Sequence, residues 1–261
     1  MTDLPALQTL RLTRAGRLLT IAFNRPDVLN AVNTQLHREL IDAFAFAARD
    51  AGSDVIVLTG EGRAFSAGGD LEQMERMIAE PALFEAEVRD AKLLVFALLD
   101  IEKPVIARVN GHAVGLGATL ALLCDVTFVA ESAKIGDPHV GVGLVAGDGG
   151  AVIWPQLVGF NRAKEFLMTG DLLTARRAAE IGLINHVVPD AELDAEVEAF
   201  CNRLLSGATE AIRWTKVTIN LELKRLAHAL LDPGLAYEAL SLRTQAHRAR
   251  VAALRARRER T

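Results

Sequence analysis

The stretch GRAFSAGGDL (residues 62–71) carries the first strong indication of fold class. It follows a short apolar run at 54–59 (DVIVLT) that is typical of a buried strand, and it precedes a segment from about Leu71 that reads as helix. Small residues let the backbone approach a ligand closely, and successive N–H groups form a concave site for an anion. A serine nucleophile at Ser66 is disfavoured, because the hydrolase elbow G-x-S-x-G needs glycine where Ala64 stands.

A second glycine loop, NGHAVGLGA (110–118), also joins a predicted strand, at 104–110, to a predicted helix, at 116–123. It is not a dinucleotide-binding fingerprint, because Gly115 and Gly117 are followed by Leu120 where a third glycine would stand. Free N–H groups at the start of a helix favour negative charge. If the two loops converge, one N–H group from each would form an oxyanion hole.

Strands, helices and glycine loops alternate through the first 160 residues, which favours an α/β fold. The other elements predicted there are a hairpin (7–13 with 17–23), a strand (126–130) and two helical segments (33–50, and 71–100 with a break near Pro81). Helices dominate after about residue 161, at 175–181, 191–205, 209–226 and 234–257, with one strand at 184–188.

The composition excludes several classes of protein. Among 261 residues, 51 % are hydrophobic and 24 % are charged, which excludes an intrinsically disordered chain. The formal net charge of −4 argues against a nucleic-acid partner, and no segment reaches the roughly 18 apolar residues of a membrane span. Two cysteines do not suggest a disulfide scaffold, and the first ten residues do not resemble a secretory signal. We therefore expect a cytoplasmic protein.

Taken together, the motifs resemble the crotonase superfamily, the enoyl-CoA hydratase/isomerase group. They occur in the family's order over about residues 5–255: NRP with NA (24–31), AFSAGGDL (64–71), PVIA (104–107), NGxAxGxG (110–117), LLCD (122–125), TGxxxTA (169–175) and GLI (182–184). The resemblance implies a ClpP/crotonase-like spiral of ββα units over 1–195 and an all-helical trimerisation region over 196–261. It also implies a homotrimer or a dimer of trimers that binds an acyl-CoA substrate, with coenzyme A as part of the substrate, no separate cofactor and no metal.

The same resemblance assigns site residues by position. The oxyanion hole would be formed by the N–H groups of Gly69 and Leu116, where the family often has glycine at the second place. The positions that match the CoA site are Arg25, Val28, Ala64, Ala67, Gly69, Asp70, Leu71 and Leu116.

The chain departs from a typical hydratase at both acidic positions. The family's two glutamates, which hold the attacking water, are replaced here by Thr119 and by His139. Thr119 would position water but is too weak an acid to replace a glutamate. Asp148 follows His139 by nine residues, and a histidine oriented by a carboxylate is a general base with a fixed tautomer. We therefore expect His139 to be the base and Asp148 to support it, although Asp148 alternatively reads as a helix N-cap.

A His and an Asp at this spacing also resemble the retro-Claisen β-diketone hydrolase branch of the superfamily. His37 and Glu238 fall where that branch has further polar active-site residues, and Tyr237 either reaches a neighbouring pocket or simply packs. From the resemblance we expect an acyl-CoA enzyme of the enoyl-CoA hydratase/isomerase type that stabilises a thioester enolate. The alternatives are hydrolysis of a C–C bond in a β-keto or cyclic β-diketone acyl-CoA, and non-catalytic acyl-CoA binding. The sequence does not identify the acyl group.

Overall fold

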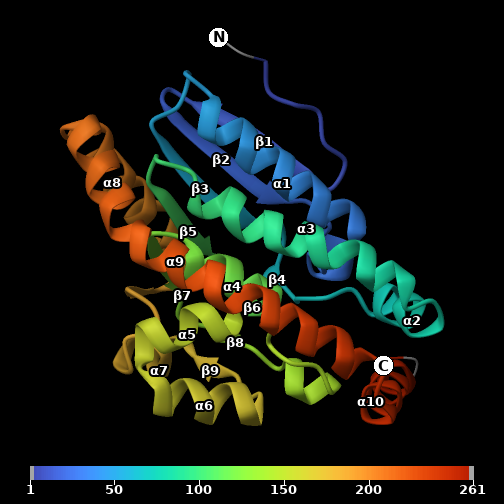
Figure 1. Cartoon of the computed structure of the whole chain (residues 1–261). Helices are drawn as coiled ribbons and strands as arrows, with labels where there is room; N and C mark the ends of the chain where they lie inside the picture. Colours follow the sequence, from blue (N-terminus) through green and yellow to red (C-terminus); the bar gives the residue numbers. More distant parts are fainter. Residues whose placement is uncertain (1–2, 259–261) are drawn as a thin grey trace.

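The computed structural model describes residues 3–258 and contains two sheets surrounded by helices (Figure 1). The larger sheet has the strand order β1-β2-β3-β5-β7-β10. Its strands are β1 (Leu10–Ala15), β2 (Leu18–Phe23), β3 (Val55–Gly60), β5 (Val105–Val109), β7 (Val126–Ala130) and β10 (His186–Val188). The β1–β2 hairpin is antiparallel, as the sequence predicts, and the other neighbours run parallel.

Four much shorter strands form the second sheet, in the order β4-β6-β8-β9. They are β4 (Ala64–Ser66), β6 (His112–Val114), β8 (Lys134–Gly136) and β9 (Leu173–Thr174). Each of β3, β5 and β7 is followed directly by one of these short strands and then by helix, which gives three successive ββα units. This arrangement confirms the predicted α/β spiral.

Two helices cover one face of the larger sheet (Figure 1). They are α1 (Thr34–Arg49) and α3 (Ala82–Leu99), which lie side by side because each buries an apolar stripe. The N-cap of α1 is Asn33, whose side chain accepts a hydrogen bond from the Leu36 amide at 2.9 Å. The shorter helices of the spiral are α2 (Leu71–Ala79), α4 (Leu116–Leu123), α5 (Gly150–Val158), α6 (Phe160–Thr169) and α7 (Ala175–Glu180). The spiral also contains three short 3-10 helices among the described residues: η1 (Pro26–Val28), η2 (His139–Val142) and η3 (Asp190–Glu192).

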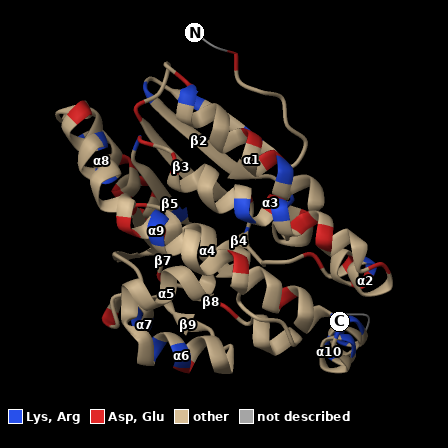
Figure 2. Cartoon of the chain, viewed as in Figure 1, with Lys and Arg blue, Asp and Glu red and all other residues tan. Residues whose placement is uncertain are grey.

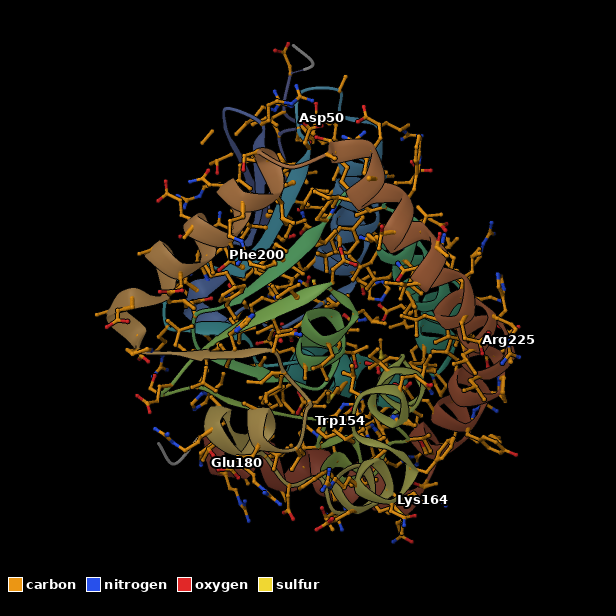
Figure 3. The ribbon with its side chains drawn as sticks, turned by 90° about the vertical axis from the view of Figure 1, so that its left-hand side faces the viewer. Asp50, Trp154, Lys164, Glu180, Phe200 and Arg225 are labelled. Atoms are coloured by element: carbon orange, nitrogen blue, oxygen red, sulfur yellow. The ribbon has the colours of Figure 1, made fainter. Side chains whose placement is uncertain are left out.

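The chain ends in α8 (Leu193–Leu205), α9 (Thr209–Leu242) and α10 (Gln245–Arg258). Figure 3 shows Phe200 of α8 beside the larger sheet, where its ring centroid is 5.3 Å from that of Phe128 in β7. In Figure 2, charges of both signs are scattered over the helices, while the described part of α10 carries basic residues only. No helix among residues 3–258 is long and apolar enough to cross a membrane.

The predicted break between 226 and 234 is wrong, because α9 continues through Pro233. Proline removes one backbone hydrogen bond from a helix, at a cost of about 3 kcal/mol. Here Pro233 is exposed, whereas Leu231 and Leu235 on either side of it are buried against the body of the protein, so packing holds the helix together. The predicted boundary at residue 195 falls inside α8, and residues 259–261 of the predicted helical region lie outside the described part of the chain.

Candidate active site

The two glycine loops meet at the base of the site. Gly68 has a φ of 82° and Gly115 a φ of 55°, backbone conformations that favour glycine. A side chain on Gly68 would come within 2.7 Å of the Val114 carbonyl oxygen, so only glycine allows this approach. The loops predicted to converge are therefore in contact in the structure.

The N–H group of Gly69 faces away from the neighbouring strand-like segment. The Val32 amide donates to the Gly68 carbonyl at 2.7 Å, and the Asp70 amide donates to the Val32 carbonyl at 3.0 Å. Peptide groups alternate direction in extended backbone, so the amide between these two bonds points to the opposite side. On that side lies a cavity lined by both Gly69 and Leu116.

Leu116 is the first residue of α4, and its N–H group belongs to the helical turn that has no intrahelical acceptor. Gly115 before it is anchored by a hydrogen bond from its amide to the Gly136 carbonyl at 3.0 Å. The N–H group of Leu116 thus begins a helix at the wall of the cavity, where the helix dipole favours a negatively charged oxygen.

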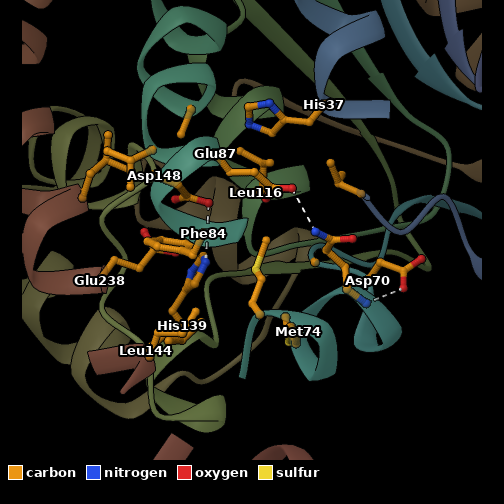
Figure 4. Close-up of a pocket in the computed structure, with 18 of the residues that line it drawn as sticks. His37, Asp70, Met74, Phe84, Glu87, Leu116, His139, Leu144, Asp148 and Glu238 are labelled. Carbon is orange, nitrogen blue, oxygen red and sulfur yellow. Dashed lines mark hydrogen bonds and ion pairs between the residues drawn. The ribbon is translucent and has the colours of Figure 1, made fainter. Parts of the chain in front are cut away.

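His139 lies between the carboxylates of Asp137 and Asp148. Its Nδ1 contacts Oδ1 of Asp137 in a short hydrogen bond. Its Nε2 lies 3.4 Å from Oδ2 of Asp148 (Figure 4). The structure therefore brings His139 and Asp148 together, as expected, but it is Asp137 that holds the Nδ1 side of the ring. Asp148 faces Nε2 instead. Its side chain also lies 3.5 Å from Oγ1 of Thr119, so the two positions that replace the family's glutamates meet through Asp148.

Asp148 does not occupy the N-cap position of α5. That helix begins at Gly150 and its N-cap residue is Gly149. Burial raises the pKa of Asp148, and a hydrogen bond from the Gly150 amide opposes this effect only in part. The same carboxylate faces His139 and Thr119.

Burial and charge shift the acidities in this cluster. Burial alone would lower the pKa of His139, but the carboxylates of Asp137 and Asp148 outweigh burial and raise that pKa well above its ordinary value. Burial and the nearby Asp148 raise the pKa of Glu238 to about 8. These shifts favour the protonated imidazole of His139 and, at neutral pH, the uncharged carboxylic acid of Glu238.

Two cavities meet at Gly69, Asp70, Met74 and His139. The larger has a volume of about 710 Å³ and opens beside η1, α2 and η2. It is lined by six of the residues predicted for CoA binding: Arg25, Val28, Ala67, Gly69, Asp70 and Leu71. Arg25 pairs with Asp70 through Nη1 and Oδ2 at 3.0 Å. Ala64 is buried in β4 and lines neither cavity, and Leu116 lines the smaller one.

The smaller cavity, of about 100 Å³, lies on the other side of His139. Its walls are mainly apolar and include the side chains of Met77, Phe84, Val88, Leu144, Leu235 and Leu242. His37 and Glu238 also line it, and burial lowers the pKa of His37 to about 4, so its imidazole is neutral. Tyr237 is 62 % exposed and lines neither cavity.

Sequence reasoning missed Asp137, although a signal was present. Asp137 precedes His139 by two residues in the segment GDPH (136–139), directly after β8. Its side chain is fully buried, and a buried carboxylate needs a partner.

The chain is similar in sequence and in fold to proteins of one known family. Residues 13–236 match the family model described as enoyl-CoA hydratase/isomerase. The chain is 38 % identical over 220 residues to a crotonyl-CoA hydratase of Syntrophomonas wolfei, covering 82 % of each chain.

Two solved structures are also similar. An enoyl-CoA hydratase/isomerase from Mycobacterium paratuberculosis superimposes with a TM-score of 0.90 at 40 % identity, over 95 % of this chain and 99 % of that one. A beta-diketone hydrolase from the cyanobacterium Anabaena, bound to (S)-3-oxocyclohexyl acetic acid, has a TM-score of 0.84 at 31 % identity, over 91 % and 95 %. The family match over most of the chain and the shared fold establish that this protein is a member of the enoyl-CoA hydratase/isomerase family.

Proposed function

We propose that this acyl-CoA enzyme stabilises a thioester enolate with the N–H groups of Gly69 and Leu116 and transfers protons through His139 and Asp148. The observation that carries the proposal is the place of His139, between two carboxylates and at the junction of the two cavities. The CoA portion would occupy the larger cavity and the acyl group the smaller one.

The first step concerns charge on the thioester oxygen. An enolate places a negative charge there, and two fixed N–H donors in a site with little water stabilise it by a few kcal/mol each. The side chain of Leu116 lines the acyl cavity, so this residue both donates a hydrogen bond and narrows the space beside the reacting carbons.

The second step concerns protons. The sequence predicts His139 as the base and Asp148 as its support, and the roles proposed here are the reverse. The two neighbouring carboxylates raise the pKa of His139 and favour its protonated form, so Asp148 would accept the proton from water and His139 would give its proton to the α-carbon of the enolate. The proton on Asp148 then passes to His139 across the 3.4 Å contact, which restores the pair. Thr119, 3.5 Å from Asp148, would help to hold the water.

Hydration of an enoyl-CoA and C–C hydrolysis of a β-keto acyl-CoA both need these groups. In hydration, the water oxygen bonds to the β-carbon and the α-carbon gains a proton. In C–C hydrolysis, the water oxygen bonds to the β-carbonyl carbon, the bond to the α-carbon breaks, and the resulting enolate is protonated. The second reaction is a serious candidate because both family glutamates are replaced and a β-diketone hydrolase is among the similar structures.

A turnover screen with enoyl-CoA and β-keto acyl-CoA substrates, followed by mass spectrometry, tests the proposal. A hydroxyacyl-CoA product identifies hydration, a double-bond isomer of unchanged mass identifies isomerisation, and a carboxylic acid released with a shortened acyl-CoA identifies C–C hydrolysis. Tight binding of acyl-CoA without any product would identify a binding protein and contradict the proposal.

A further inference from the structure

A histidine of the last helix lies directly against the turn that carries His139. His247 is fully buried at 0 % exposure, and its Nδ1 lies 2.7 Å from the carbonyl oxygen of Val142, the last residue of η2. A carbonyl oxygen has no hydrogen to give, so Nδ1 carries the proton and donates it. This hydrogen bond ties α10 to the turn whose first residue is His139.

Two further contacts hold the same turn against α10. The guanidinium of Arg250 donates from Nη1 to the Gly141 carbonyl at 3.2 Å. Gly143, with a φ of 77°, ends the turn, and a side chain at this position would come within 2.9 Å of the His247 backbone. The outer side of the turn is therefore fixed at three successive residues.

The helix also reaches the opposite wall of the site. Nη1 of Arg255 lies 2.8 Å from Oε2 of Glu75 in α2, and Leu254 lines the larger cavity together with His139. The N-cap of α2 is Asp70, the residue directly after Gly69. Helix α10 thus contacts both α2, which begins directly after Asp70, and the turn that begins at His139. Figure 1 shows α10 beside α2.

We propose that His247 is a positioning residue, whose hydrogen bond to Val142 holds the η2 turn so that the His139 imidazole stays between Asp137 and Asp148. The catalytic consequence rests on the proposed function, whereas the consequence for the environment of His139 does not. Burial lowers the pKa of His247, and its Nε2 is buried without a partner among the described residues, so the ring stays neutral and Nδ1 remains a donor.

The pKa of His139, measured by NMR of histidine-labelled enzyme, tests the inference without any substrate. The groups that act on this pKa are Asp137, Asp148 and Glu238. In His247→Leu the hydrogen bond to Val142 is lost and the η2 turn is no longer held against α10. The His139 imidazole then moves away from the carboxylates, and its pKa falls toward the ordinary value. His247→Asn keeps the native pKa, because the asparagine amide nitrogen takes the place of Nδ1.

The matched control is Val251→Ala, which truncates another buried side chain of α10 and leaves the hydrogen bond in place. Thermal unfolding shows which variants are folded. If His247→Leu does not fold, Arg250→Ala takes its place in the test. Arg250 is exposed, and this substitution removes only the hydrogen bond to the Gly141 carbonyl. We expect it to lower the pKa of His139 by a smaller amount.

Kinetics then separates positioning from general damage. We expect kcat of His247→Leu to fall by roughly tenfold to 100-fold, with KM for the CoA ester nearly unchanged. An unchanged His139 pKa in folded His247→Leu overturns the inference, and so does an equal shift in Val251→Ala. A shifted pKa with an unchanged kcat supports positioning and counts instead against the proposed role of His139.

Discussion

Nε2 of His139 lies 3.4 Å from Oδ2 of Asp148, and His139 stands where the smaller and the larger cavity join. The two side chains come from different elements, a turn after β8 and the loop before α5. The neighbouring carboxylates favour the protonated form of His139, so a proton can move between the two side chains without any change in the net charge of the site.

Removing the imidazole tests its chemical role. His139→Ala should lower kcat by roughly 10²- to 10⁴-fold, because a positioned acid or base contributes about that much. Asp148→Asn should also lower kcat, since asparagine cannot accept the proton from water. The dissociation constant of a non-reactive CoA thioester, measured by calorimetry, should change little in both. Full activity in Asp148→Asn would leave that residue with a purely structural role.

Asp137 gives a second test of the cluster. Asp137→Asn keeps the shape of the side chain but removes the charge on the Nδ1 side of His139. The pKa of His139 should therefore fall, and NMR titration measures it directly. We expect kcat to fall as well, because an asparagine allows the wrong tautomer. A His139 pKa equal to that of the native enzyme would contradict the assigned geometry.

The proposed oxyanion hole uses backbone N–H groups, so proline is the informative substitution. Gly69→Pro removes the N–H group and should reduce turnover by at least 10²- to 10³-fold. Gly69→Ala keeps the N–H group, and its added carbon would lie 2.5 Å from the terminal methyl of Met74, a flexible side chain that can shift. We expect the alanine variant to stay within about tenfold of the native rate. A folded proline variant with native turnover would mean that the thioester charge is held elsewhere.

Glu238 should make stability depend on pH. Its folded pKa of about 8 is above the ordinary value, so the folded state holds a proton that the unfolded state has lost. The stability it contributes is fully present below its unfolded pKa, near 4.5, and is lost as pH rises to about 8. In urea titrations, the free energy of unfolding should fall over this interval more steeply in the native protein than in Glu238→Gln. Parallel curves would contradict the raised pKa.

The predicted trimer remains to be measured. Leu231 and Leu235 of α9 are buried within the chain. Other apolar residues of this helix remain on its surface: Trp214, Ile219, Leu221, Tyr237 and Leu240 are each more than 60 % exposed. Exposed apolar groups in such numbers favour association. Light scattering at micromolar concentration should give the mass of a trimer or hexamer, and a strict monomer would contradict the prediction.

The sequence predicted the large sheet well and the small one poorly. Strand β3 is an almost continuous apolar run, and β5 is apolar except for Arg108, which is how a strand buried on both faces reads. Strands β4, β6 and β8 have three residues each, too few for any periodicity to appear, and β4 and β6 fall within the two glycine loops of the sequence.

Among the helices, α5 was expected only as the helix that Asp148 would cap, and α6 was not predicted. Packing carries α9 through a proline that local propensity reads as an end.

At the site, the glycines were the clearest signal because their constraint is local. Gly68 and Gly115 each adopt a positive φ, which favours glycine, so the glycine itself marks the position in the sequence. The place of Asp137 was not visible, because its contact with His139 depends on how the chain turns after β8. Likewise, His247 lies 105 residues beyond Val142, and only the folded α10 brings the two together.

The small sheet places one residue of the proposed site after each of its first three strands. Gly69 follows β4, Leu116 follows β6 and His139 follows β8, and these strands are consecutive neighbours in that sheet. In the proposed function, charge stabilisation would belong to the first two turns of the spiral and proton transfer to the third. A change of residue after β8 can alter which bond is made or broken while the donors after β4 and β6 stay in place. The fold is in this sense modular, and exchanging the segment between β8 and α5 among relatives is a direct route to new reactions on the same bound thioester.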